Sequence, residues 1–593
     1  MGKVKKSKKN PRSRVNPLKK KPETAAPVAD EGKSQVLPLI NKLKSADAKE
    51  KAMAIGTLNI LAENPQMRKL LLKERIVATV MEYALNDNSR EVVVESFGLL
   101  RNLAIEEGYD VVKYMWRQNV WASLQAAFEA IAAQFASGWD DLAGPEKALV
   151  YDWCENVLSL VVVMATTDEV IFESVFNKID PLLQFVYTAL SQKQSPRLVH
   201  AGLDFIYEFL SESTQFVDLV SSQAEKLPLA NLDAQGDRLT GVYVDGIKYN
   251  FTSSPDDYAR ILLSLYDTCS SVDLEGIIKL LQSTEPISAD TDSATHAKAQ
   301  AEARADLRAL EVSLDLITSI LEGLSINERK FNAPVKLSDD LLQNVLFAKV
   351  WPMITEIVKF ELNHDGSLYL LNRALYAMNN FCWLMLANQK LPVQWFEHSN
   401  AGWDLVDAVV QKASSQSAND LQKTTLSIMW GISKAQGPQI KNKLRREFVD
   451  SLITTVGTIN HEDDDQVDLK LAIMGFLASV APQLEDITLI GAVGNFLMQT
   501  AETMSTPVNA NCTRLTIEAL NLIYDLFGDK EYPYDQPVFV AQGYLPRLEA
   551  LEPQVKVMFK KVDRNKFNQL KVEAEEAWVN LGRFIEYKHD EQK

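Results

Sequence analysis

The sequence feature that most constrains the fold is a helical unit that recurs after about forty residues. In its clearest copy, residues 88–104, Phe97 and Leu100 fall on one apolar face of a helix, and Asn88 stands where a capping residue is expected. The stretch 46–62 repeats this frame 42 residues earlier, with an apolar residue under each of those two. An all-helical repeat of this length is typical of armadillo and HEAT stacks, so we predict an all-α solenoid.

The repeats divide into two groups. We predict a disordered tail over 1–33, armadillo-like repeats over 34–220, an irregular connector and loop over 221–300, and HEAT-like repeats over 301–593 that end in a helical cap. Within the connector, 241–251 reads as a small β-hairpin or ordered loop. The second group is centred on Leu314, Met378, Ile428, Met474 and Leu522.

Charge is distributed unevenly along the chain. Residues 1–22 hold ten lysines and arginines and no acid, so a net charge of −17 leaves −27 on the remainder. The tail contains too few large apolar side chains to offset the entropy of ordering. An acidic body behind a basic arm should attract basic partners, and salt should weaken that attraction.

Cysteine and histidine usage argues for an intracellular protein without disulfides. The four cysteines and six histidines have neither disulfide-framework nor zinc-ligand spacing. No apolar run approaches the roughly 18 to 20 residues that span a bilayer, and no secretory signal follows the basic start. We expect a soluble protein that does not contact membranes.

No stretch carries a convincing catalytic, cofactor or metal signature, so we expect a non-enzymatic protein without a cofactor or metal. Gly491 and Gly494 read as a helix-joining turn, and 461–465 as a solvated loop without the glycine of a calcium site. The helical spacing of Met378 and Cys382 favours repeat packing over a cofactor box. Two basic clusters read as solvated faces, with RNA contact as the alternative: Lys441, Lys443, Arg445 and Arg446, and Lys556, Lys560, Lys561 and Arg564.

The basic tail resembles the proline-tyrosine nuclear localisation signal that transportin-type karyopherins read. Such signals join a basic segment, an arginine and a proline beside a bulky residue on one flexible chain, so that weak contacts reinforce one another. Here Leu18 replaces the usual tyrosine. A plain lysine-rich import signal and a solubilising or RNA-binding tail remain alternatives. The predicted karyopherin-binding residues are Lys5, Lys6, Lys8, Lys9, Arg12, Arg14, Pro17 and Leu18.

Taken together, residues 1–9, 99–104 and 301–322 and the order of the repeat groups resemble the symportin family. The resemblance implies a monomeric adaptor that shuttles between cytoplasm and nucleus with a transportin-type karyopherin. It also implies cargo: the two large-subunit ribosomal proteins that bind 5S ribosomal RNA, which the adaptor would contact only indirectly. In the family one cargo lies in the solenoid groove and the other uses an acidic loop. The corresponding loop here, 283–300, holds only three acids.

Two other classes of protein remain open. An importin-alpha-like receptor would repeat a tryptophan and asparagine pair along its groove, whereas Trp153 with Asn156 is the one hint of that pattern. An assembly scaffold without an import role would keep its nuclear distribution when the tail is deleted. The sequence does not predict which residues bind cargo.

Overall fold

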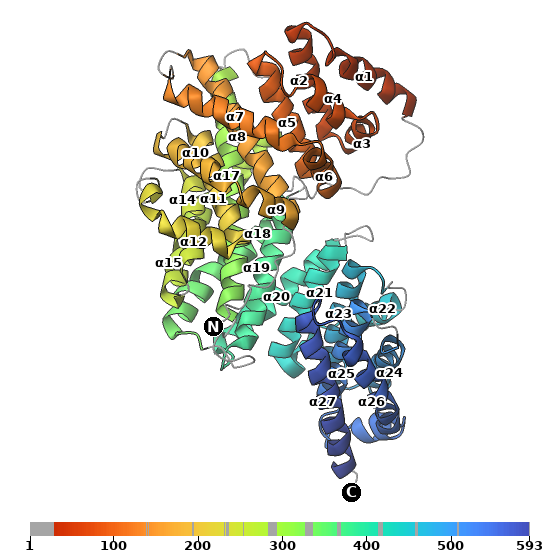
Figure 1. The fold of residues 1–593 in the computed structure, drawn as a ribbon. Coiled ribbons are helices and arrows are strands. Elements are labelled where there is room, and N and C mark those ends of the chain that lie inside the picture. The colour runs from red at the N-terminus through yellow and green to blue at the C-terminus, as the bar shows by residue number, and fades with distance from the viewer. Residues whose placement is uncertain are drawn as a thin grey trace. The chain divides into compact units, whose positions relative to one another are not determined.

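Successive α-helices build the chain (Figure 1). The computed structural model describes residues 29–591 apart from gaps at 138, 140–141, 193–194, 230–231, 233–236, 253, 283–292, 326–335, 365–368, 413–418, 457–460 and 507–508. No β-strand occurs within these described ranges. Two compact units are present, one with residues up to Thr268 and Ile287–Val312, the other with Cys269–Pro286 and residues from Ser313. An all-α repeat fold was predicted, and this prediction is confirmed.

Helices α1 to α15 belong to the first unit, together with the first part of α17. Their bounds are α1 Ala29–Lys42, α2 Ala48–Glu63, α3 Pro65–Lys73, α4 Ile76–Tyr83, α5 Arg90–Glu107, α6 Tyr109–Arg117, α7 Val120–Ala136, α8 Gly144–Thr167, α9 Glu169–Phe176, α10 Ile179–Gln192, α11 Pro196–Glu212, α12 Thr214–Ser222, η1 Ala224–Lys226, α14 Arg238–Phe251 and α15 Pro255–Ser270. Helix α1 begins inside the stretch that we assigned to the tail. The long helices α2, α5, α8, α11 and α14 pack successively against one another.

Helix α5 shows how the repeat forms. Phe97 and Leu100 are buried, as their spacing predicts, and each contributes about 1.5–3 kcal/mol of hydrophobic stabilisation. The helix begins one residue later than expected, with Ser89 rather than Asn88 at the capping position. Gly98 permits close packing, because a Cβ atom there would lie 3.2 Å from Nδ2 of Asn156 in α8.

The prediction of a hairpin over 241–251 is wrong, because these residues lie in α14. The helix is capped by Asp237, whose carboxylate accepts a hydrogen bond from the amide of Thr240. Gly246 is required for packing rather than for a turn, since a Cβ atom there would lie 2.6 Å from the ring of Tyr207. The stretch predicted as a hairpin or ordered loop is therefore a helix that packs closely on α11.

The second unit contains α16 and the rest of the chain. Helix α17 runs through the boundary between the units. The π-helix η2 continues directly into α18. The bounds are α16 Leu274–Gln282, α17 Ser293–Ser325, η2 Leu341–Val350, α18 Trp351–Asn363, α19 Leu371–Ala387, α20 Val393–Lys412, α21 Asn419–Gln436, η3 Gly437–Asn442, α22 Arg446–Val456, α23 Asp464–Val480, η4 Pro482–Leu484, α24 Ile487–Met504, α25 Ala510–Leu526, η5 Asp535–Val540, α26 Tyr544–Lys561 and α27 Asn568–Glu591.

The predicted apolar stripes of the second unit form its core. Met378, Ile428 and Met474 are fully buried in α19, α21 and α23, which pack one on the next. The turn predicted at Gly491 and Gly494 is wrong, because both lie inside α24. A Cβ atom on Gly494 would lie 2.9 Å from Tyr544 of α26 and 3.0 Å from Phe527, which follows α25, so the glycine permits close helix packing.

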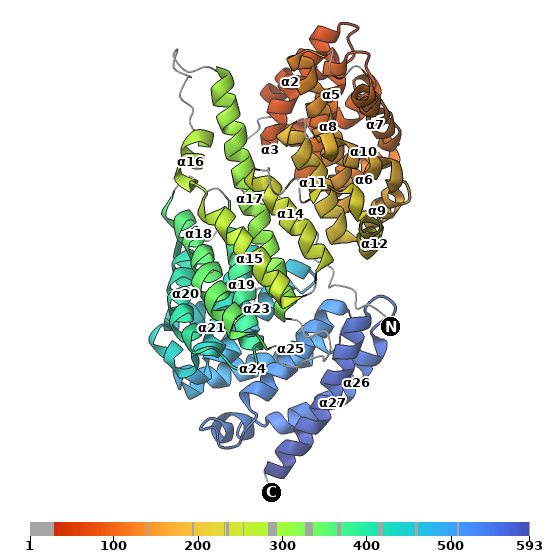
Figure 2. The same cartoon turned by 90° about the vertical axis from the view of Figure 1, so that its left-hand side faces the viewer.

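The last two helices lie side by side in both views (Figures 1 and 2). Helix α27 also packs on α25, where Leu570, Ala574 and Ala577 form a small apolar cluster with Ile517. The C-terminal helices therefore cover an apolar face of α25.

Among the described residues, three helical segments are long and apolar enough to cross a membrane by length and composition: Gly144–Thr167, Leu341–Asn363 and Gln466–Leu484. The prediction that no apolar run approaches that length is therefore wrong. Between 61% and 67% of each apolar window is buried inside the protein. These apolar side chains are used in packing between neighbouring helices.

Candidate functional site

The predicted karyopherin signal lies outside the described residues. All eight of its residues, Lys5, Lys6, Lys8, Lys9, Arg12, Arg14, Pro17 and Leu18, precede Ala29, where the described chain begins. The assignment of these residues stays a prediction.

Side chains that bridge neighbouring long helices form a row across the first unit, which we call the first polar ladder. Arg101 of α5 donates to the amide oxygen of Asn156 in α8 at 2.7 Å. Arg197 of α11 reaches back to Glu155 of α8 at 2.6 Å. Further bridges of the ladder are Asn59 with Glu95, Arg197 with Asp152, His200 with Asp237, Tyr243 with Asp204, and Arg238 with Asp306.

The first polar ladder holds more carboxylates than cations. Its arginines are Arg101, Arg197, Arg238 and Arg308, and its carboxylates are Glu95, Asp152, Glu155, Asp204, Glu208, Asp237, Asp306 and Glu311. Several carboxylates face solvent, with the side chain of Asp152 37% exposed and that of Glu155 32% exposed. The ladder therefore presents a surplus of negative charge.

Burial and neighbouring charges together set the pKa of Asp152. Burial raises this pKa, the neighbouring carboxylate of Glu155 adds to the shift, and Arg197 opposes both. Burial lowers the pKa of Arg101, and the positive charge of Arg197 acts in the same direction. An additional cation bound beside Asp152 and Glu155 would relieve their mutual repulsion.

Arg308 joins the first part of α17 to α11. Its guanidinium lies 3.0 Å from Glu311 and within 4 Å of both Asp204 and Glu208. Burial by itself would lower the pKa of Arg308, but Tyr243 and the three carboxylates raise it above its ordinary value. The guanidinium of Arg308 therefore stays positively charged among these carboxylates.

The second unit repeats the arrangement in what we call the second polar ladder. Lys423 of α21 and Arg514 of α25 share Asp468 of α23, with the arginine at 2.6 Å. Asn380 of α19 donates to the carbonyl oxygen of Thr318 in α17 at 3.0 Å. Further bridges are Arg373 with Asp315, Tyr376 with Asp420, Trp383 with Ser427, Asn511 with Asp464, and Lys434 with Asp525.

The contact between two tryptophans, Trp383 and Trp430, on the second polar ladder was not predicted from the sequence. The rings of Trp383 in α19 and Trp430 in α21 meet edge to face at 5.1 Å, and Lys434 covers the second ring at 5.5 Å from its centroid. Trp383 and Trp430 are 47 positions apart, close to the spacing of the repeat centres, and that spacing is the sequence signal that could have indicated their contact.

In the first unit, the side chain of Asn156 accepts a hydrogen bond from Arg101 and donates one to the carbonyl oxygen of Val94.

The two basic clusters of the sequence differ in the structure. The basic cluster is the group Lys441, Lys443, Arg445 and Arg446, and every member contacts a carboxylate. Lys441 contacts Glu485, Lys443 contacts Asp404 and Arg445 contacts Asp407, each at 2.6 Å. Arg446 contacts Asp450 at 3.0 Å and also Asp486. The second group, which we call the basic patch, comprises Lys556, Lys560, Lys561, Arg564, Lys566 and Lys571; no ion pair to any of these six occurs within the described ranges.

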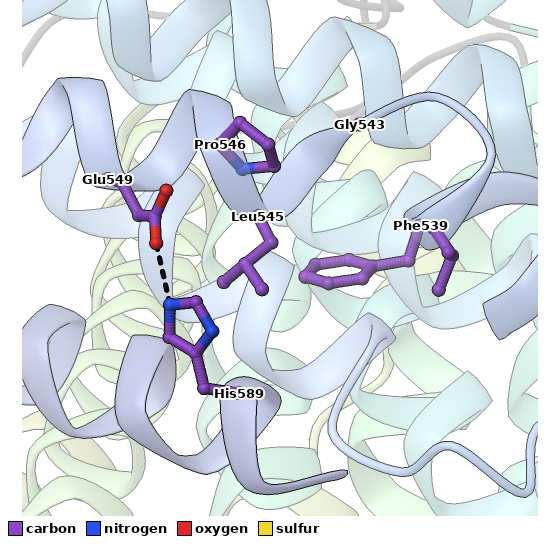
Figure 3. A pocket seen from close by; sticks show the side chains of 7 residues that line it. Phe539, Gly543, Leu545, Pro546, Glu549 and His589 are labelled. Carbon is purple, nitrogen blue, oxygen red and sulfur yellow. Dashed lines mark hydrogen bonds and ion pairs between the residues drawn. The ribbon is translucent and has the colours of Figure 1, made fainter. Parts of the chain in front are cut away.

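Other candidate sites offer little chemistry. Among the described residues no group of three acidic, histidine or cysteine side chains could hold a metal ion. A cavity of about 280 Å³ near the C-terminus is lined by Phe539, Leu545 and Pro546, with His589 and Glu549 hydrogen-bonded to each other at 2.6 Å on its rim (Figure 3). Met378 and Cys382, the proposed alternative cofactor box, are fully buried in helix packing.

These features define the class of the protein: an α-helical repeat scaffold whose bridged long helices present acidic side chains. Residues 336–592 match the family described as SYO1-like, TPR repeats. Synchronized import protein 1 of Saccharomyces cerevisiae is 27% identical and covers 100% of this chain and 99% of its own length. The armadillo repeat protein involved in nucleocytoplasmic transport Syo2 of Schizosaccharomyces pombe is 26% identical with full coverage of both chains.

Symportin 1 of Chaetomium thermophilum is 24% identical over 97% of this chain and 98% of its own length. The chain is therefore similar over nearly its full length to proteins of the symportin family. Among solved structures, the karyopherin Kap121p bound to the SUMO protease Ulp1p superposes on this chain with a TM-score of 0.31 and 13% identity. The superposition covers 93% of this chain and 45% of that one.

Proposed function

We propose that the protein is a non-enzymatic nuclear import adaptor that captures basic cargo on its polar ladders and chaperones it into the nucleus. The observation that carries the proposal is the surplus of carboxylates along the first polar ladder. Full-length similarity supports it, because two relatives that match the whole chain are named for import and nucleocytoplasmic transport. An acidic surface neutralises basic chains and raises their rate of capture.

The proposed carrier is a transportin-type karyopherin that binds the tail. Lys5, Lys6, Lys8 and Lys9 supply the basic segment, Arg12 or Arg14 the arginine, and Pro17 with Leu18 the apolar anchor. With these contacts the protein shuttles between cytoplasm and nucleus as a monomer.

The tail is tested by the triple substitution Arg14→Ala, Pro17→Ala and Leu18→Ala. We expect loss of transportin binding and of nuclear entry, with cargo binding unchanged. Unchanged nuclear entry would instead favour an assembly scaffold without an import role.

The proposed cargoes are the large-subunit ribosomal proteins that bind 5S ribosomal RNA. Such proteins are strongly basic, and free basic chains associate with nucleic acid without specificity. The adaptor contacts 5S ribosomal RNA only through them. Because the loop 283–300 holds only three acids, we assign the contacts to the polar ladders rather than to that loop.

Charge removal on the first polar ladder tests cargo capture. The variant with Asp152→Asn and Glu155→Gln removes two carboxylates that lie beside both Arg101 and Arg197. We expect affinity for a purified basic ribosomal protein to fall about tenfold at low salt, since close charge pairs at an interface contribute about 1.5 kcal/mol or more. The salt dependence of binding should become shallower.

The matched control removes the same charge away from the ladder. Glu129 of α7 and Glu173 of α9 are exposed, and Glu129→Gln with Glu173→Gln should leave cargo affinity within twofold. Equal loss in both double variants would mean that net charge, and not the ladder, attracts the cargo.

A further inference from the structure

The basic patch stands out in an acidic protein. Six cations and one acid occur between Lys556 and Lys571, whereas the whole chain has a net charge of −17. The one acid, Asp563, accepts a hydrogen bond from the backbone amide of Asn565 at 2.9 Å. The patch therefore keeps a local surplus of positive charge.

Helix geometry accounts for only part of the patch. Lys560 and Lys561 end α26, where cations stabilise the negative end of the helix dipole. Lys571 donates to the carbonyl oxygens of Phe559 and Lys560 at that end. Arg564 lies beyond the helix in the exposed connection to α27, so its charge does not serve the helix end.

Aromatic rings are interleaved with the cations. Phe559 and Trp578 stack at 5.2 Å with an interplanar angle of 16°. Lys556 lies over the tryptophan ring at 4.9 Å, and Lys571 lies over the phenylalanine ring at 5.0 Å. Phe567, the residue immediately before α27, leaves 45% of its surface exposed.

We propose that the basic patch binds single-stranded RNA. Cations without carboxylate partners are free to neutralise phosphates and release counterions, and an exposed ring supplies a platform on which a base can stack. Phe567 is that platform, and Lys560, Lys561, Arg564 and Lys566 contact the backbone. The negative charges of the rest of the protein are screened over about 8 Å at physiological salt, so a local cationic surface can act independently of them.

The exposed ring favours RNA over an acidic polypeptide. Carboxylate side chains on a partner would need only the cations, whereas a nucleic acid uses both charge and a stacking face. The proposal does not depend on the import role, since it concerns another surface and another kind of ligand.

The test measures binding of a fluorescent 20-nucleotide oligouridine to the full-length protein by anisotropy across a salt series. The patch variant combines Lys560→Gln, Lys561→Gln, Arg564→Gln and Lys566→Gln, all at exposed positions. The slope of log K against log salt should become shallower by about 0.7 for each phosphate that the variant no longer neutralises, so by nearly 3. Phe567→Ala should lower affinity about fivefold or more and leave the slope unchanged.

A cluster variant serves as the control, with Lys441→Gln, Lys443→Gln, Arg445→Gln and Arg446→Gln. It removes the same charge from a group whose members are already paired, so RNA affinity should stay within twofold. Circular dichroism of each variant shows whether the helical fold is kept. Equal loss of affinity in the patch and cluster variants would overturn the proposal.

Cross-linking separates the patch from the basic tail, which can also attract RNA. With 4-thiouridine in the oligonucleotide, we expect cross-linked peptides that contain Phe567. Cross-links confined to residues 1–22 would refute RNA binding at this surface. Tighter binding of polyglutamate than of oligouridine to the patch would also refute it and would favour an acidic protein partner.

Discussion

The basic cluster at 441–446 and the basic patch at 556–571 look alike in the sequence and differ in the structure. In the cluster, four cations face five carboxylates, which come from α20, α22 and the segment before α24. In the patch, none of the six cations forms an ion pair within the described ranges, and the one acid between them in the sequence accepts a backbone hydrogen bond. A run of lysine and arginine is therefore a poor guide to surface potential, because the charge that remains depends on partners far away in the chain.

The polar ladders extend the same lesson to acidic residues. Asp468 is shared by Lys423 and Arg514, so its charge is largely compensated. Asp152 and Glu155 lie together beside Arg197, and burial raises the pKa of Asp152. What distinguishes a binding surface from a structural ion pair is the charge that remains after pairing.

The strongest test of this comparison concerns a buried cation. Lys588 of α27 is 1% exposed and lies 3.0 Å from Asp535 and 2.7 Å from Glu591. Asp535→Asn should lower the free energy of unfolding by about 3 kcal/mol, because it leaves a buried ammonium undercompensated. Urea denaturation measures the loss.

The control for that measurement is Glu586→Gln, an exposed position of the same helix, which should change stability by less than about 0.5 kcal/mol. A loss below about 1 kcal/mol in the Asp535 variant would mean that Glu591 alone compensates Lys588.

Much of the fold could be predicted from the sequence because its signals are local. The burial of Phe97 and Leu100 follows from helical periodicity. The errors at 241–251 and at Gly494 share a cause: Gly246 and Gly494 each permit a close approach by a residue distant in sequence, such as Tyr207 against Gly246. A local pattern cannot distinguish such a glycine from a turn glycine.

The ladders and the pairing of the basic cluster could not be predicted in the same way. Arg101 and Asn156 are 55 positions apart, and Lys441 and Glu485 are 44 apart. Such partners are fixed by the register between helices, which a single sequence does not show. Net acidity was predictable from composition, but the place where cationic charge remains unpaired was not.

A second prediction concerns removal of the carboxylate partners of the basic cluster. Asp404→Asn, Asp407→Asn and Glu485→Gln free Lys441, Lys443 and Arg445 from their partners. If pairing is what separates the cluster from the patch, the variant should bind oligouridine more tightly. Neutralisation of three further phosphates would steepen the slope of log K against log salt by about 2.

The matched control neutralises three exposed acids of the first unit, with Glu129→Gln, Glu173→Gln and Glu225→Gln. It changes net charge equally and should leave the salt slope unchanged. The same gain in both variants would show that total charge governs RNA binding and would break the comparison.

A smaller effect concerns stability. Lys443 bonds Asp404 and the carbonyl oxygen of Asn400, so Lys443→Ala should lower the free energy of unfolding by about 0.5 kcal/mol. Lys566→Ala removes an exposed cation that lies beyond the end of α26 and has no carboxylate partner in the described chain, so it should cause no measurable change. Equal destabilisation by the two substitutions would mean that the cluster pairs contribute nothing to folding.

The smallest effect is a pH dependence that only the cluster should show. The hydrogen bond from Lys441 holds the pKa of Glu485 below its usual range. Since the folded pKa lies below the unfolded one, the pair stabilises the protein at neutral pH, and this contribution is lost as pH falls below about 4.3. The difference in urea midpoint between the native protein and Lys441→Ala should therefore stay constant from pH 7 to pH 5 and shrink only in stronger acid. A change in that difference between pH 7 and pH 5 would assign the effect to another group. A constant difference would mean that the ion pair between Lys441 and Glu485 is kept throughout the pH range in which the patch would bind RNA in a cell.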